Sequence, residues 1–439
     1  MPSVFNHQAL SGDNQVAHSY GNMQHDPHRW IMIQETTFTN WVNEQLSRKD
    51  VSSLRVDNIA TDFADGVALI ELVELLQNRR CLGKVYRASG LEVHRLSNIR
   101  LALDAMEEDG VKLVNIGPGD ITEGNSKLIL GLIWCLILRY QIGGRTRIPP
   151  KKLMLAWLQA ALPDFKIRNF TSDWSDGIAL SALLNYCQPG LFPNWQALDT
   201  RNKVDNCVCA MELAQRSFGI PMVLSPADLA SPNLDDLSGM TYLSYFMKAH
   251  SPGYAATLHR VHQLLPPDFT VTNFSTDWND GYLLCHLVHS VGGQIPGWPS
   301  VRRDPAFAHR NIQNAIDAAE KLGVEPILTA NEILDTEGEF YLGIMAYVAK
   351  ICQLGGSFVD GLARPNNRPR AQLIEDIRKH HIVDQHVVVD VAYLDNSVTL
   401  HDLEIVIVNP RGAKIRAELR RTPNGASVSF LPDIAGDYQ

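Results

Sequence analysis

The sequence predicts a mainly α-helical chain of three similar domains, followed by a short β-rich segment. Two observations support this prediction. A motif of the form Asp-x-x-Asp-Gly recurs three times at domain-sized intervals, and each copy precedes an apolar run with helical periodicity. Beyond residue 383 the sequence changes to short β-branched segments separated by Gly, Pro and Asn, which is typical of strands and turns.

Length, composition and charge restrict the class of protein. The chain has 439 residues, 45% hydrophobic and 20% charged, which suits several globular domains. Its net charge of −9 gives no global basic field, so we expect no nucleic-acid partner. The most apolar run, residues 128–138, is shorter than the ~20 residues that cross a bilayer, so the chain is not expected to be transmembrane.

The three repeated units share one order of features. Each has the Asp-Gly motif, then a helix led by Asn, then a Gly that suits a left-handed helix end, and finally an apolar closing helix. A calcium loop is the alternative for the motif, but the acidic ligands at alternate positions are missing, so helix capping is favoured. The motifs span 62–66, 173–177 and 277–281, the Asn residues are Asn98, Asn206 and Asn311, and the closing helices are 127–141, 237–247 and 340–352.

These features resemble the calponin-homology domain, and over residues 34–251 they resemble the actin-binding head of filamins. The closing helix of the first unit carries Gly-Leu-Ile-Trp, ending at Trp134, as in the type-1 domain of such heads. The second unit has Trp157 in its first helix, as in the type-2 domain. The resemblance implies a flexible tail over 1–33 and three calponin-homology domains over 34–143, 148–251 and 253–354.

The segment after the helices resembles part of an immunoglobulin-like filamin repeat. A Pro-, Asn- and Arg-rich linker is expected over 355–382, and a truncated repeat over 383–439. Three helical domains before such a repeat depart from the filamin pattern of two. They resemble an insect filamin-like protein with three calponin-homology domains, of which this chain would be a shortened form or a fragment. The expected strands lie at 387–391, 404–408, 415–419 and 427–431.

The resemblance implies where an actin filament would bind. In this family the contact comes from the first helix, from the segment after the second helix and from the start of the closing helix of the first domain. Trp41, Leu128 and Ile129 are expected in the core, so exposed polar and cationic residues are the candidates. These are Gln34, Thr37, Asn40 and Asn43, then Lys84, Arg87 and Arg95, and finally Asn125 and Lys127.

Two departures from the family pattern affect function. Residues 29–35 read Arg-Trp-Ile-Met-Ile-Gln-Glu where filamin-like heads carry several lysines, so weaker binding is expected. The third unit has Val261 in place of Trp157 and lacks the Gly-Leu-Ile-Trp pattern, so it receives no actin site. We expect Trp134 to contact the second domain and hold the pair compact.

The sequence therefore predicts a cytoplasmic, F-actin-binding adaptor or crosslinker component of the actin cytoskeleton, which binds filaments through its first two calponin-homology domains. The third domain and the tail would reach other proteins. A signalling scaffold that binds proteins or phosphoinositides without actin is the alternative. No Gly-rich phosphate loop, Ser-His-Asp set or zinc-spaced His/Cys cluster is present, so we expect no catalytic residues, metal or cofactor, and no enzyme.

Overall fold

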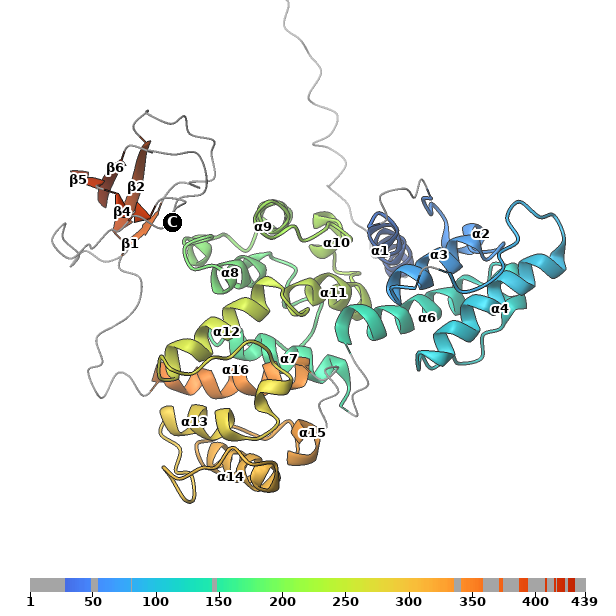
Figure 1. The fold of residues 1–439 in the computed structure, drawn as a ribbon. Coiled ribbons are helices and arrows are strands. Elements are labelled where there is room, and N and C mark those ends of the chain that lie inside the picture. Colours follow the sequence, from blue (N-terminus) through green and yellow to red (C-terminus); the bar gives the residue numbers. More distant parts are fainter. Residues whose placement is uncertain are drawn as a thin grey trace, which may run out of the picture. The chain divides into compact units, whose positions relative to one another are not determined.

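The computed structural model describes most of the helical part and six short strands of the tail. The described residues are 28–48, 54–79, 81–143, 148–334 and 341–357, with 371–373, 387–393, 407–408, 414–415, 417–422 and 425–430 in the tail. The chain forms two compact units, residues 1–358 and 359–439 (Figure 1). Most of the predicted linker lies outside the described residues.

The first domain has four main helices, as predicted, with two short connecting helices. Helix α1 begins before the predicted boundary at residue 34, so the predicted tail is too long. The last helix, α6, continues into a π-helical turn, η1. The main helices are α1 (Arg29–Leu46), α3 (Val67–Leu76), α4 (Glu92–Glu108) and α6 (Ser126–Leu136), with α2 (Ile59–Asp62), α5 (Pro118–Thr122) and η1 (Ile137–Gly143) between or after them.

The second and third domains repeat this order of helices. In the second, the main helices are α7 (Pro150–Ala161), α8 (Ile178–Cys187), α9 (Lys203–Phe218) and α11 (Asp236–Leu243), with short helices η2 (Trp195–Ala197), α10 (Pro226–Leu229) and η3 (Ser244–Phe246). In the third, they are α12 (Pro252–Leu264), α13 (Tyr282–Ser290), α14 (Ala308–Lys321) and α16 (Tyr341–Ser357), with η4 (Thr276–Trp278), η5 (Pro305–Phe307) and α15 (Ala330–Leu334).

The Asp-Gly motif is a capping and turn device, as predicted. In the first domain, Asp65 Oδ1 accepts a hydrogen bond from the backbone N–H of Val67 at the start of α3. Gly66 has φ +76°, a left-handed conformation that favours glycine. The Nδ2 of Asn98 donates to the carbonyl of Asp65 and thereby ties α4 to this turn. Each domain repeats this arrangement, which explains why the motif and the Asn recur together.

Large aromatic side chains fill the core of the helical unit. Trp41 and Ile129 are fully buried, which confirms their predicted core role, and Trp174 and Trp278 are fully buried as well. The indole N–H groups of Trp174 and Trp278 donate to backbone carbonyls, so neither polar group is left unsatisfied. Leu128 is only half-buried, so its assignment to the core is wrong.

The apolar run at the end of the first domain is a core helix. Ser126–Gly143, which comprises α6 and η1, is long and apolar enough by composition to cross a membrane. Its side chains at Ile129, Ile133 and Leu136 are nevertheless fully buried in the protein core. A buried core helix and a membrane span share this composition, and the packing fits the first.

The third domain packs on the first two helices of the second domain. Helix α16 lies along α7, and α12 packs against α8 (Figure 1). The indole N–H of Trp157 on α7 donates to Thr257 Oγ1 on α12 at 3.0 Å. A Cβ at Gly253 would lie 2.5 Å from the Trp157 ring, so only glycine allows this approach. The buried apolar residues of the second and third domains therefore belong to one continuous core, which also includes those of the first domain.

The tail unit contains two antiparallel sheets. Strands β1 (Ala371–Leu373), β2 (Val387–Tyr393), β6 (Gly425–Phe430) and β5 (Ala417–Thr422) form one sheet in that order. Strands β3 (Ile407–Val408) and β4 (Lys414–Ile415) pair separately. Strands β2 to β6 lie in or near the predicted β segments, whereas β1 lies within the stretch 355–382 that was predicted to be a linker, so that prediction is wrong for residues 371–373. The immunoglobulin-like identity of the tail stays a prediction.

Candidate functional site

The segment between α3 and α4 is held by the same asparagine that organises the first domain. Asn98 Oδ1 accepts from the backbone N–H of Tyr86 at 2.9 Å, and Asn98 Nδ2 donates to the Tyr86 carbonyl at 2.9 Å. The Tyr86 ring also stacks on His94 with centroids 3.9 Å apart. These contacts fix the segment on both sides, so its charged side chains project from a defined backbone.

This segment, residues 84–95, forms a surface that we call the basic strip. Lys84 is exposed, with its Nζ 4.9 Å from the centre of the Tyr86 ring. The Arg87 side chain is 59% exposed and pairs with Glu71 Oε1 at 3.1 Å. Leu91 and Val93 are also exposed, at 59% and 64%. Two cations and two apolar side chains therefore face solvent together.

Arg95, the third predicted cation, is less accessible than the other two. Its side chain is half-buried, and its Nε has no hydrogen-bond partner among the described residues. Sequence reasoning missed Leu91 and Val93. The sequence did contain a signal for their exposure. Two apolar residues that lie two positions apart at the polar start of a helix do not fall on one stripe facing the core.

The polar side chains of α1 do not share one exposed face, contrary to the sequence interpretation. Gln34 is 8% exposed and Thr37 is 1% exposed, so both are buried. A helix turns ~100° per residue, so each three-residue step falls ~60° short of a full turn. From Gln34 to Asn43 the positions drift about half-way round the helix, and different members meet different neighbours.

Helix α1 packs against the second domain along much of its length. Gln34 Nε2 donates to Asp235 Oδ1 at 3.1 Å, and Asn40 Nδ2 donates to the Val223 carbonyl at 3.1 Å. Near the other end of α1, Tyr245 donates to Glu44 Oε2 at 3.1 Å. We call this set of contacts the α1 interface. It covers Gln34, which sequence reasoning placed on the surface.

An ion pair at one end of α1 and a buried hydrogen bond at the other stabilise the α1 interface. Arg29 pairs with Asp228 at 3.3 Å where α1 begins. Burial, together with the Glu44 carboxylate, raises the pKa of Tyr245, so its hydroxyl remains a hydrogen-bond donor at neutral pH. Burial lowers the pKa of the nearby Lys248. None of these partners in the second domain could be identified from the sequence, because no short motif marks them.

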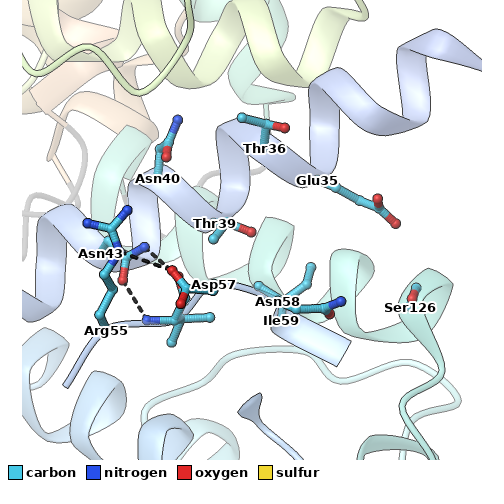
Figure 2. A pocket seen from close by; sticks show the side chains of 11 residues that line it. Glu35, Thr36, Thr39, Asn40, Asn43, Arg55, Asp57, Asn58, Ile59 and Ser126 are labelled. Carbon is cyan, nitrogen blue, oxygen red and sulfur yellow. Dashed lines mark hydrogen bonds and ion pairs between the residues drawn. The ribbon is translucent and has the colours of Figure 1, made fainter. Parts of the chain in front are cut away.

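Figure 2 shows a polar pocket on the side of α1 that lies beside α2 and α6. Asn43 closes one side of it by bonding both the N–H and the carbonyl of Val56. Arg55 and Asp57 form an ion pair at 3.1 Å on the same side. The other lining residues are Glu35, Thr36, Thr39, Asn40, Asn58, Ile59 and Ser126. The amide of Asn43 is thus engaged within its own domain.

The start of α6 presents two of the predicted contact residues to solvent. Asn125 and Lys127 are exposed. Asn125 caps the helix, because its Oδ1 accepts from the backbone N–H of Leu128 at 3.4 Å. On the same helix, Trp134 is half-buried and stacks on Phe38 of α1 with centroids 6.1 Å apart. This stacking lies within the first domain, and the interdomain role of Trp134 stays a prediction.

Metal-ligating side chains do not gather anywhere in the described part of the chain. No group of three or more His, Cys, Asp or Glu residues there could hold a metal ion. The seven cysteines are all free thiols, and burial raises the pKa of Cys207 and Cys285 to about 12. Buried thiols of this kind are unreactive packing residues.

Three helical domains built on one Asp-Gly-Asn arrangement define a tandem array of a single domain type. Residues 32–142, 148–252 and 260–356 match the family model described as "Calponin homology (CH) domain". The chain therefore belongs to the calponin-homology family, and the predicted number of such domains is confirmed.

Curated relatives agree with this assignment. Filamin-C of Rattus norvegicus is 41% identical over 230 residues, which are 50% of this chain and 8% of that protein. Filamin-A of Drosophila melanogaster is 39% identical over 233 residues, or 50% of this chain and 10% of that protein. Alpha-actinin-like protein 1 of Schizosaccharomyces pombe is 37% identical over 230 residues, or 51% and 36%. The chain spans only a small part of the length of these relatives, and its predicted likeness to filamins is confirmed.

Proposed function

We propose that this chain binds actin filaments through its first calponin-homology domain and serves as a non-enzymatic adaptor or crosslinker component of the cytoplasmic actin cytoskeleton. The observation that carries the proposal is the basic strip, which gathers exposed cations in a chain whose net charge is −9. Actin filaments are acidic, so these cations would steer the encounter and contribute contacts. Relatives named filamin and alpha-actinin-like protein support the same partner.

The predicted contact residues include an exposed group and a buried group. Lys84, Arg87, Asn125 and Lys127 are exposed and would meet the filament directly. Gln34 and Thr37 are buried. They would reach a filament only after the first domain separates from the second. We therefore assign the initial contact to the first group.

Filament co-sedimentation of the full chain tests this proposal. The double variant Lys84→Glu/Arg87→Glu should weaken binding roughly tenfold at low salt, because reversing an exposed charge turns a weak attraction into a repulsion. The effect should shrink as salt screens the charges. Arg201→Glu is the matched control, since Arg201 is an exposed arginine of the second domain. Equal binding by the double variant and the control would contradict the assignment.

The alternative function, a scaffold that binds phosphoinositides or proteins without actin, is favoured by one observation. The α1 interface buries part of the surface that the family resemblance assigns to the filament. Sedimentation with vesicles that contain phosphoinositide separates the two functions. Binding to vesicles with no pelleting on filaments would favour the scaffold.

A further inference from the structure

The three asparagines that tie each domain together also define equivalent surface positions. Asn98 donates to the carbonyl of Tyr86, Asn206 to that of Asp199, and Asn311 to that of Arg302. In each domain the same asparagine also binds the carbonyl of the Asp in the Asp-Gly turn. Tyr86, Asp199 and Arg302 therefore occupy one position in three copies of the same frame. The segments that follow Tyr86, Asp199 and Arg302 along the chain can therefore be compared with one another.

The segment of the third domain, residues 302–310, is basic. It holds Arg302, Arg303 and Arg310 against a single acid, Asp304, and all four are exposed. Asp304 is engaged locally, because its Oδ1 accepts from the N–H of Ala306 at 2.9 Å. Arg302 and Arg310 form no ion pair with a described residue. We call this surface the second strip.

One arginine is held in the same way on both strips. Arg87 follows Tyr86 and pairs with Glu71 on α3. Arg303 follows Arg302 and pairs with Asp280, which caps α13, at 3.0 Å. In both cases an acid at or near the helix after the Asp-Gly turn positions the guanidinium, while more than half of the arginine side chain remains exposed.

The second domain lacks such a strip. Its equivalent position is the acid Asp199, which forms an ion pair with Arg201 at 2.6 Å. Over residues 199–205 the charges of Asp199, Arg201, Lys203 and Asp205 cancel. The first and third domains therefore present basic segments at the same place in the fold, and the second domain does not.

We propose that the second strip is a further docking site for an acidic protein surface, and that this surface belongs to the filament. The proposal rests on the filament-binding function above and extends it to the third domain. A lipid surface fits less well, because anionic membranes also take up apolar side chains. Every exposed large hydrophobic residue in the described part of the chain lies in the first domain: Trp30, Met32, Leu91, Val93 and Val114.

The test compares wild type with two double variants of the full chain, one in the second strip and the Lys84→Glu/Arg87→Glu variant described above. Arg302→Glu/Arg310→Glu removes the second strip without touching the ion pair of Arg303, and Arg201→Glu is again the control. We expect the double variant to bind filaments roughly three- to tenfold more weakly at low salt, with an unchanged melting temperature. Vesicles of an acidic lipid, run in parallel, report any membrane affinity.

The outcomes separate this inference from the function on which it rests. If wild type pellets and only Lys84→Glu/Arg87→Glu weakens binding, the second strip is not a filament contact and the proposed function stands. If wild type does not pellet at all, both are overturned. A second-strip variant that loses vesicle binding while it keeps full filament binding overturns the inference in favour of a membrane.

Discussion

Single residues hold each domain at the point where the Asp-Gly turn meets the Asn-led helix. In the second domain, Gly177 has φ +74°, and a Cβ there would lie 2.7 Å from the backbone N of Cys207. Asn206, beside it, donates to the carbonyls of Asp176 and Asp199. The glycine is required both for its dihedral angle and for the close approach of α9, so replacing it should lower the free energy of unfolding.

Gly177→Ala should destabilise the second domain by about 3–4 kcal/mol, because α8 and α9 must move apart to admit the methyl group. Gly219→Ala is a matched control. Gly219 has φ +66°, but a Cβ there meets nothing within 4 Å, so only the dihedral cost of about 1 kcal/mol is expected. Urea unfolding of both variants measures the difference. Equal losses would show that the close approach is unimportant.

For single residues, the sequence predicts those features that depend only on the residue type and its neighbours along the chain. Capping by Asp65, the left-handed Gly219 at the end of α9 and the burial of Trp41 follow from turn geometry and from side-chain size, and the structure has all three. The burial of Gln34 could not be predicted in the same way. It depends on the second domain, whose partners lie about 200 positions away in sequence.

Among the elements, α1 belongs to two packing environments. One side packs on α3 and α6 of its own domain, and the other packs on α11 of the second domain. The sequence periodicity predicted the helices on either side of the basic strip correctly, and two of the three predicted cations, Lys84 and Arg87, are exposed. Periodicity alone cannot distinguish a polar helix face in water from one that is hydrogen-bonded to a neighbouring domain.

The double variant Gln34→Ala/Asn40→Ala should loosen the α1 interface, because it removes two hydrogen bonds worth about 1 kcal/mol each. Distances between spin labels on the first and second domains should then broaden toward longer values. Thr36→Ala is the control, since Thr36 is exposed on the same helix. An unchanged distance distribution would show that these bonds do not hold the domains together.

The start of α16 contacts the end of the first domain. Tyr341 donates to the carbonyl of Ile142 at 3.3 Å, and its ring lies 3.2 Å from where a Cβ of Gly143 would be. Tyr341→Phe should speed amide exchange around 141–143 about fivefold, the equivalent of about 1 kcal/mol. Tyr347→Phe on the same helix is the control, because the hydroxyl of Tyr347 is buried without a described partner. Equal exchange in both variants would exclude this anchoring role.

For the whole molecule, the shared core of the second and third domains means that they should unfold together. A chain ending at residue 251 would expose the apolar faces of α7 and α8 that α16 and α12 cover. It should melt at a lower temperature and bind a hydrophobic dye, whereas a chain ending at 358 should not. A chain ending at 251 that melts like the longer one would show that the third domain is an independent appendage. The sequence repeat predicts three domains, but not that α16 and α12 of the third cover apolar faces of the second.

The packing of α16 along α7 also has a mechanical consequence. Tension on the chain beyond Ser357 enters the helical unit through α16, the last helix before the tail. Tyr341 at the start of α16 bonds to Ile142, shortly before α7 begins, so a pull at Ser357 against the first domain loads the helix pair in shear, and contacts along its length resist together instead of peeling apart one by one. The third domain would therefore transmit force to the second domain through the contacts between α16 and α7. Pulling would strain this pair before it reached the short connection through Ser251.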